Sequence, residues 1–267
     1  MPTTLREVPA RHGIHIPPDL LAAGRSDAAL PTTTVLLPAY NEEHGLATVL
    51  VKLSRLLDAT YEIVVVDDGS SDRTALMAEL HGAHLIRHGS NRGKGSAFQT
   101  GLAYARGAKV ITLDADDTYP VEAVPELVDA LDRYDMVVGT RQAGRSNISP
   151  FNRFGNAVFR HAIGLAAGRR VSDPLTGLYG LQRDMLRRMN LTSVGFGIEA
   201  EIVIKAGRLG ATVLEIPINY RPRIGESKLS PVRDGLIIGR TVASLALSRP
   251  AARQMTVPST ERPSSSS

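Results

Sequence analysis

The chain has 267 residues, enough for one large domain or two small ones, and its 43% apolar content is that of a globular protein. It has no cysteine, which excludes disulfides and thiolate metal sites and favours a reducing cytoplasm. The net charge of +4 suits an anionic substrate or a membrane surface, but the scattered basic residues lack the interleaved aromatics typical of nucleic-acid binding.

We expect three regions along the chain. Residues 1–31 show little periodicity and are predicted to be a poorly structured leader, without the continuous apolar run of a signal peptide. Residues 249–267 end in four serines and are predicted to be a disordered tail. Residues 32–248 are predicted to form one domain. Its longest apolar run near the C-terminus contains Arg240 and is too short to span a bilayer.

Apolar runs alternate with segments of helical periodicity throughout the domain. The run 62–66 is almost wholly apolar, which is typical of a strand buried on both faces of a parallel sheet. Repeated strand–helix units of this length predict an α/β fold with a mostly parallel open sheet and helices on both faces. The predicted strands are 35–37, 62–66, 83–87, 108–113 and 135–139, and the predicted helices are 43–57, 72–80, 94–106 and 121–132.

Polar segments follow every predicted strand. Ligands of open α/β sheets bind beyond the carboxyl ends of the strands. A single polar end could be a turn and a helix cap, and we expect Ser71 or Asp72 to cap the next helix. Five polar ends on one rim are better explained by a site. These segments are 38–42, 67–72, 91–95, 114–117 and 139–141.

The run Thr112-Leu113-Asp114-Ala115-Asp116-Asp117 places three carboxylates at the end of a buried strand. Taken alone, Asp-x-Asp is most simply a solvated strand end followed by a turn. Two carboxylates separated by one residue can also chelate a hard divalent cation, which can carry phosphate oxygens as its other ligands. The other polar strand ends favour this second interpretation.

Other residue types at the rim indicate a nucleotide diphosphate. Asp67 and Asp68 can accept hydrogen bonds from a base or from ribose hydroxyls, although they would repel phosphate. Arg141, Arg145 and Arg153 offer bidentate forks suited to phosphate. The site is therefore predicted to hold a nucleotide diphosphate together with a cation.

The segment Gly93-Lys94-Gly95 is not a complete phosphate-binding P-loop, because His88 occupies the position of its first glycine. Its amides either face an anion or simply begin a glycine-rich helix, and the two alternatives are equally consistent with the sequence. None of the histidines, His88 included, shows metal-ligand spacing.

The order of these motifs resembles that of family 2 glycosyltransferases, and the resemblance covers roughly residues 32–245. The later motifs look like those of dolichol-phosphate mannosyltransferases and their polyprenyl-phosphate relatives. The first set is Pro38-Ala39-Tyr40-Asn41-Glu42, Val66-Asp67-Asp68-Gly69-Ser70, Asn91-x-Gly93-Lys94-Gly95 and Asp114-Ala115-Asp116. The second set is Gly139-Thr140-Arg141, Asp173-Pro174-x-Thr176-Gly177, Gly195-Phe196, Glu215-Ile216-Pro217 and Gly225-Glu226-Ser227-Lys228-Leu229.

The resemblance implies a single nucleotide-diphospho-sugar transferase domain of the GT-A, Rossmann-like type, and it implies roles for individual residues. Asp114 and Asp116 would ligate Mg²⁺ or Mn²⁺ on the donor, and together with Arg141 they would be the catalytic residues. Arg141 and Arg153 would hold the phosphate of the acceptor. The nucleotide-sugar would contact Pro38, Tyr40, Glu42, Val66, Asp68, Lys94, Asp114, Ala115, Asp116, Arg223 and Lys228.

The chain departs from the family pattern at a few positions. Thr118 stands where the family has Gln, and Asp117 adds a carboxylate before it. Gly197 stands where a Lys is common, which removes one contact to the diphosphate. The membrane-spanning C-terminal helices of some members are not expected here.

The implied reaction is an inverting transfer of mannose or glucose from GDP-mannose or UDP-glucose to a polyprenyl or dolichyl phosphate. A lipid phosphate is ionised at neutral pH and needs no strong general base. A soluble or cell-envelope hydroxyl acceptor, the alternative, would need one, and Asp117, Glu199 and Glu201 are candidates. Glu199 and Glu201 are two apart in a helical stretch, so at least one of them is expected to be structural.

Other functions and locations remain open. A non-catalytic sugar-nucleotide-binding module would keep Asp68 but could lose the metal ligands. A sugar-nucleotide pyrophosphorylase would need a glycine-rich loop where residues 38–42 stand. The helical stretches 157–165 and 236–247 combine apolar residues with arginine and are either ordinary core-facing helices or membrane-interface helices. We therefore expect a cytoplasmic protein, with peripheral contact at the cytoplasmic face of the membrane as an alternative.

Overall fold

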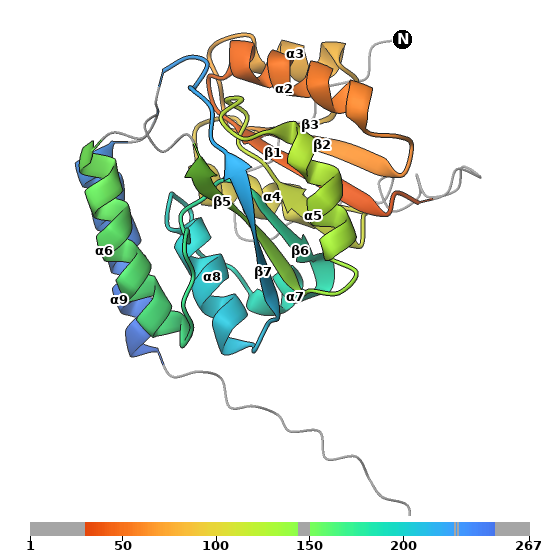
Figure 1. The fold of residues 1–267 in the computed structure, drawn as a ribbon. Helices are drawn as coiled ribbons and strands as arrows, with labels where there is room; N and C mark the ends of the chain where they lie inside the picture. The colour runs from red at the N-terminus through yellow and green to blue at the C-terminus, as the bar shows by residue number, and fades with distance from the viewer. Residues whose placement is uncertain (1–29, 144–149, 227, 229, 249–267) are drawn as a thin grey trace, which may run out of the picture.

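The structure of the chain is a computed structural model, and it describes residues 30–143, 150–226, 228 and 230–248 (Figure 1). The predicted tail, 249–267, and nearly all of the predicted leader, 1–31, lie outside the described residues. Both stay predictions. The described residues form a sheet covered by helices on both faces, which confirms the predicted fold class.

In the described part of the chain, seven strands make one sheet in the order β3-β2-β1-β4-β6-β5-β7. All neighbouring pairs are parallel except the two that involve β6, which is antiparallel to β4 and to β5. The strands are β1 Thr33–Ala39, β2 Tyr61–Asp67, β3 His84–Arg87, β4 Lys109–Thr112, β5 Met136–Ala143, β6 Tyr179–Gln182 and β7 Val213–Asn219.

The reversal of β6 has a geometric consequence for the site. Because β4 and β5 both run antiparallel to β6, they run parallel to each other, and β7 is parallel to β5. The segments that follow β1, β2, β4, β5 and β7 therefore all leave the sheet at one rim. The segment that precedes β6 enters at this same rim, so residues 173–178 arrive beside the carboxylates that follow β4.

The five predicted strands and the four predicted helices are confirmed with small shifts at their ends. The predicted helix 121–132 begins as a 3₁₀ turn, η2 Val121–Ala123, before α5 Val124–Ala130. The other helices are α2 Glu43–Leu56, α3 Thr74–Leu80, α4 Lys94–Tyr104, α6 Pro150–Ala167, α7 Arg183–Met189, α8 Ile198–Arg208 and α9 Pro231–Leu247.

Two strands were not predicted from the sequence. β6 has four residues and includes Gly180, which weakens any strand pattern. β7 contains Pro217, whose ring removes a backbone donor. Proline is tolerated here because, among the described residues, β7 is an edge strand that pairs on one side only, with β5.

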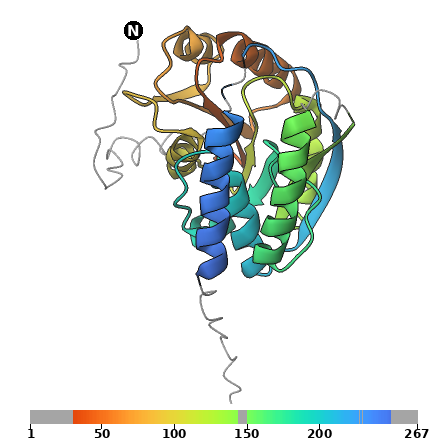
Figure 2. The ribbon, with the colours of Figure 1, turned by 90° about the vertical axis from the view of Figure 1, so that its left-hand side faces the viewer.

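The two faces of the sheet bury separate apolar clusters. One cluster lies under α2, α3 and α5 and includes Leu46, Val49, Leu50 and Leu53, which recur at helical spacing along the inner face of α2. The other lies under α4, α7 and α8. The helices α6 and α9 pack against α8 outside this second layer and stand side by side in Figure 2.

The predicted apolar helices 157–165 and 236–247 are thus parts of α6 and α9. Each buries part of its surface: Ile163 is fully buried in α6, and Ile238 and Val242 are buried in α9. Each also leaves large apolar side chains exposed, as considered below. Among the helices of the described residues, none combines the length and apolar character needed to cross a bilayer.

The close packing of α4 on the sheet gives a test of the fold. A Cβ on Gly101 would lie 2.1 Å from Leu36 Cδ1 and 3.1 Å from Val66 Cγ2, and both side chains are fully buried. We expect Gly101→Ala to lower the free energy of unfolding by about 1–3 kcal/mol, because an overpacked core must shift.

The matched control is Gly235→Ala in α9, where a Cβ would meet nothing within 4 Å. Alanine favours the helix over glycine by about 1 kcal/mol, so this variant is expected to be as stable as the parent or more stable. Denaturant unfolding of both variants measures the difference. Equal stability of the two would contradict the described packing of α4.

Candidate active site

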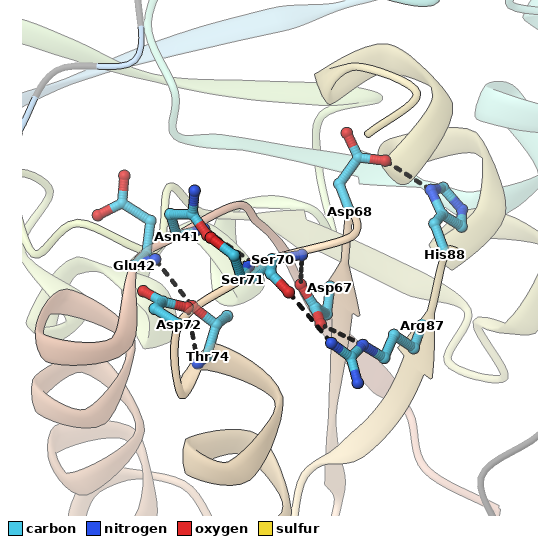
Figure 3. Close-up of polar contacts among 10 residues, drawn as sticks. All are labelled: Asn41, Glu42, Asp67, Asp68, Ser70, Ser71, Asp72, Thr74, Arg87 and His88. Atoms are coloured by element: carbon cyan, nitrogen blue, oxygen red, sulfur yellow. Dashed lines mark hydrogen bonds and ion pairs between the residues drawn. The ribbon is translucent and has the colours of Figure 1, made fainter. Parts of the chain in front are cut away.

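The loops after β1 and β2 are tied together by side chains at the rim (Figure 3). The amide of Asn41 donates to Ser70 Oγ at 2.8 Å, and the amide of Glu42 donates to Thr74 Oγ1 at 2.8 Å. Asp72 Oδ1 accepts from the amide of Thr74 at 2.9 Å. Asp72 therefore satisfies an amide at the start of α3, as expected, although the N-cap position itself is Arg73.

The two adjacent aspartates after β2 have different roles. Asp67 is fully buried; its Oδ1 accepts from the amide of Ser70, and its Oδ2 lies 3.0 Å from Arg87 Nε on β3. In Figure 3 its side chain points below the rim, toward Arg87. We therefore assign Asp67 to the structure of the turn, contrary to the expectation that it would contact a nucleoside.

Asp68 holds the loop that leads into α4. Its Oδ1 accepts from His88 Nδ1 at 2.6 Å and from the amide of Arg92 at 2.9 Å, and its Oδ2 accepts from the amide of Gly93 at 2.7 Å. The ring of His88 is held on its other side by Thr100 Oγ1, 2.9 Å from Nε2. The carboxylate of Asp68 is thus oriented by three groups of the protein. Sequence reasoning assigned no role to His88.

Asp114 meets Lys94 at the start of α4. Lys94 Nζ lies 2.7 Å from Asp114 Oδ1 and 2.5 Å from Glu199 Oε1 at the start of α8. Burial alone would lower the pKa of Lys94, but the two carboxylates outweigh it and raise this pKa well above its ordinary value. Lys94 therefore stays charged between them.

Asp116 meets a second cation. Its Oδ2 lies 2.6 Å from Arg223 Nη1, and its Oδ1 accepts from both the amide and the hydroxyl of Thr118. Burial raises the pKa of Asp116, and the nearby charge of Asp114 raises it further, although Arg223 opposes both. Thr118, the departure from the family pattern, therefore orients Asp116 in this structure.

Arg223 also forms an ion pair with Glu42, the residue just before α2. Burial raises the pKa of Glu42 to about 7, against the opposing effect of Arg223. The backbone next to Arg223 pairs with the turn after β4: the amide of Arg221 donates to Thr118 O, and the amide of Ile224 donates to Asp116 O. The segment after β7 therefore lies directly on the Asp114–Asp116 turn.

The turn after β4 is also held from beneath. A Cβ on Gly45 would lie 2.6 Å from Ala115 O, so α2 packs directly on the main chain of the turn. Asp117 has a positive φ of 61°, which aspartate tolerates better than most residues. Both of its oxygens lie 2.6 Å from Lys52 Nζ on α2. Asp117 therefore serves as an anchor of the turn, and we do not retain it as a general base.

The other two candidate bases are also paired. Glu201 accepts from the amides of Thr192 and Ser193 and pairs with Lys205, so it supports the loop before α8. Glu199 faces Lys94 at the site. The expectation that at least one of the two is structural is confirmed for Glu201.

Arg141 is buried beside the turn. Its Nε and Nη2 donate to the two oxygens of Asp173 at 2.7 and 2.5 Å, its Nη2 donates to Leu175 O, and its guanidinium lies over the ring of Tyr220. Asp173 thus orients the arginine predicted to hold the acceptor phosphate. Its role was not recognised from the sequence, although the Asp173–Gly177 motif was the signal for it.

The remaining predicted residues occupy different parts of the rim. Val66 is fully buried beneath α4, so only its main chain could reach a nucleoside. Ala115 is buried between the two metal-ligand candidates. Pro38 and Tyr40 are half-buried at the end of β1, whereas Lys228 and Arg153 are exposed, the latter in the first turn of α6.

The residues of the turn fit a hard divalent cation. Asp114 and Asp116 supply carboxylate oxygens, the ligands that Mg²⁺ and Mn²⁺ prefer, and both already bind positive groups in this structure. Within the described residues no cluster contains three or more candidate metal ligands. Two carboxylates suffice where substrate phosphates and water complete the shell.

Comparison with a protein-family model identifies the family to which this chain belongs. The model described as "Glycosyl transferase family 2" matches residues 34–190, more than half of the chain. The chain belongs to glycosyl transferase family 2. This confirms the resemblance inferred from the motifs, and with it the GT-A fold and the glycosyltransferase class of enzyme.

Two individual relatives are similar to this chain in sequence over most of its length. Dolichyl-phosphate hexose transferase of Haloferax volcanii is 35% identical over 215 residues, which cover 80% of this chain and 93% of that protein. Dolichol-phosphate mannosyltransferase of Pyrococcus furiosus is 33% identical over 208 residues, which cover 73% of this chain and 58% of that protein. These hexose-transferring relatives argue against a non-catalytic binding module.

A crystal structure of glucosyl-3-phosphoglycerate synthase from Mycobacterium tuberculosis, in complex with Mn²⁺, UDP and glucosyl-3-phosphoglycerate, has a similar fold. The TM-score is 0.64 and the identity 27%, and the match covers 91% of this chain and 88% of that one. A structural neighbour of this glycosyltransferase therefore binds a divalent metal and a nucleoside diphosphate in the same crystal structure.

The contact between Gly177 and Asp114 gives a test of the site. A Cβ on Gly177 would lie 2.1 Å from Asp114 Oδ2, so Gly177→Ala must displace the carboxylate. We expect sugar transfer to fall about a hundredfold, because small misplacements of a reacting group have effects of this size.

The matched control for Gly177→Ala is Gly89→Ala, in a loop at the same rim where a Cβ would meet nothing within 4 Å. It is expected to keep its activity. Steady-state kinetics with a chemical denaturation curve for each variant measures both effects. Full activity in Gly177→Ala would show that the position of Asp114 does not matter.

Proposed function

We propose that this family 2 glycosyltransferase is an inverting, divalent-metal-dependent enzyme that moves mannose or glucose from a nucleotide-sugar to a polyprenyl or dolichyl phosphate. The observation that carries the proposal is the Asp114–Asp116 turn. Its two carboxylates lie at the strand-end rim, and each is paired with a cation from another segment.

The proposed donor site consists of the Asp114–Asp116 turn and the loops at the strand-end rim. Asp114 and Asp116 would hold Mg²⁺ or Mn²⁺, which would stabilise the charge that develops on the departing nucleoside diphosphate. The loop residues Pro38, Tyr40 and Asp68 would contact the nucleoside. The support for a nucleotide-sugar is the mycobacterial neighbour, whose structure contains UDP with Mn²⁺.

The acceptor side rests on phosphate chemistry. Arg141 and Arg153 would hold the acceptor phosphate in line with the anomeric carbon, and Asp173 fixes the orientation of Arg141. A phosphate oxygen that is already ionised attacks without a general base. This agrees with a site in which Asp117, Glu199 and Glu201 are all engaged with lysines. Direct displacement inverts the configuration at the anomeric carbon.

The outer helix pair supports a lipid-borne acceptor. α6 exposes Val158 and Leu165, the latter 86% exposed, and α9 exposes Val232, Leu236 and Leu247, the last 87% exposed. Exposed Arg233 and Arg240 on α9 would suit anionic headgroups. The enzyme would then work at the cytoplasmic face of a membrane, where a polyprenyl phosphate presents its headgroup.

A second candidate is transfer to a small phosphorylated acceptor. The mycobacterial neighbour is named as glucosyl-3-phosphoglycerate synthase, and it covers more of this chain than either relative above. Its product also contains a phosphate, so the arginine pair would serve either acceptor. Only the acceptor assay separates the two.

The metal role can be tested with Asp116→Asn, which removes one charge and changes little volume. We expect sugar transfer to fall about a hundredfold to a thousandfold, the scale seen when a group that stabilises transition-state charge is lost. Radiolabelled GDP-mannose and UDP-glucose, each with undecaprenyl phosphate and with 3-phosphoglycerate, identify donor and acceptor in one set of assays. Unchanged turnover in the variant, or full activity in excess chelator, would contradict the proposal.

The membrane surface can be tested by vesicle co-sedimentation. We expect Leu165→Glu and Leu236→Glu to weaken binding to vesicles with anionic lipids, because a charged side chain replaces an exposed leucine that would contact the lipid. The control is Leu80→Glu on α3, where the parent side chain is 67% exposed on a different helix. If all three variants bind as the parent does, α6 and α9 do not form the membrane-binding surface.

A further inference from the structure

Lys94 is shared between two carboxylates that belong to different parts of the site. Asp114, at 2.7 Å, lies on the metal turn, and Glu199, at 2.5 Å, lies at the start of α8. The side chain of Glu199 is buried, and no charged partner other than Lys94 lies within ion-pairing distance among the described residues. Lys94 thus has one partner that would ligate a metal and one that would not.

Arg223 repeats this arrangement on the other side of the turn. It pairs with Asp116, the second metal-ligand candidate, at 2.6 Å, and with Glu42 just before α2. Again one carboxylate belongs to the metal turn and the other does not. The two cations come from unrelated segments, the start of α4 and the segment after β7. Each nevertheless lies between one carboxylate that is a candidate metal ligand and one carboxylate that is not.

A divalent ion on Asp114 and Asp116 would lie close to both of these positive groups. Like charges at such distances repel strongly in a partly buried site. Lys94 and Arg223 would therefore have to turn away from the two aspartates before the ion is bound tightly. A diphosphate at the same place would attract them, because it supplies the negative charge that the aspartates no longer share.

We propose that Lys94 and Arg223 are exchangeable counter-ions of the metal ligands, which make tight metal binding depend on the nucleotide. When the nucleotide and the metal bind together, each cation passes from its aspartate to the diphosphate. Glu199 and Glu42 are positioning residues that keep the two cations at the rim during the exchange. The proposal rests on the metal role proposed above for Asp114 and Asp116.

This exchange predicts reciprocal coupling between metal and nucleotide. In the parent enzyme, Mn²⁺ alone should bind weakly, and UDP or GDP should tighten it about tenfold or more, within the usual range of coupling between two sites. Arg223→Gln and Lys94→Met should bind Mn²⁺ alone about tenfold more tightly than the parent, with a smaller gain on adding nucleotide. Free Mn²⁺ measured by electron paramagnetic resonance gives both affinities without any turnover.

A matched control removes a positive charge near the turn without touching either metal ligand. Arg221 lies on the same segment as Arg223 but pairs with Glu122, so Arg221→Gln should bind Mn²⁺ as the parent does. If Arg221→Gln tightens Mn²⁺ binding as much as Arg223→Gln, a general charge effect replaces the exchange and the proposal is wrong.

Asp116→Asn separates the failure of this inference from the failure of the metal site itself. If it binds Mn²⁺ like the parent, the metal role proposed for Asp114 and Asp116 is wrong, and the proposed exchange is wrong as well. If it loses Mn²⁺ while Arg223→Gln binds Mn²⁺ no more tightly than the parent, only the exchange is wrong. Arg223 is partly exposed on a loop segment, so this variant decides the matter even if Lys94→Met does not fold.

Discussion

Carboxylates gather at one rim of the sheet because the parallel strands β1, β2 and β4 end there, and burying so much negative charge requires compensation. A buried carboxylate is tolerated when it is paired or fully hydrogen-bonded. Asp68 is compensated by backbone amides and a histidine, whereas Asp114 and Asp116 are compensated by Lys94 and Arg223. The need to balance this charge explains which segments converge on the rim.

The sheet topology makes this convergence possible. A single antiparallel strand, β6, leaves β5 and β7 running in the same direction as β4. The segment before β6 therefore reaches Asp114 with Gly177, and the segment after β7 reaches Asp116 with Arg223. A site that depends on a diphosphate and a cation is thus built from segments up to 181 residues apart in the sequence.

Sequence patterns predicted much of this because they reflect local physics. The apolar run of β2 and the leucine spacing of α2 are set by burial, and both were recognised. The polar strand ends predicted the rim, and the ordered motifs predicted the family. β7 was missed because Pro217 is compatible with a strand only at the edge of a sheet, and edge position is a property of the assembled sheet.

Roles of side chains were harder to predict than their presence. Asp67 and Asp68 are neighbours of identical chemistry, yet one is buried against Arg87 and the other holds the loop before α4. Asp117 is a candidate general base from the sequence, but in the structure its carboxylate pairs with Lys52, 65 residues away. Such differences depend on the direction in which each side chain points from the end of the strand. They also depend on which residues of other segments pack against it.

The sequence by itself determined the α/β class, the rim of polar strand ends and the family, because strand burial, helical periodicity and ordered motifs are local properties of the chain. Only the tertiary structure decided the ion-pair partners: Glu199 for Lys94, Glu42 for Arg223 and Asp173 for Arg141. Ion pairing depends on distances of a few ångströms between segments that the fold brings together. No local pattern encodes those distances.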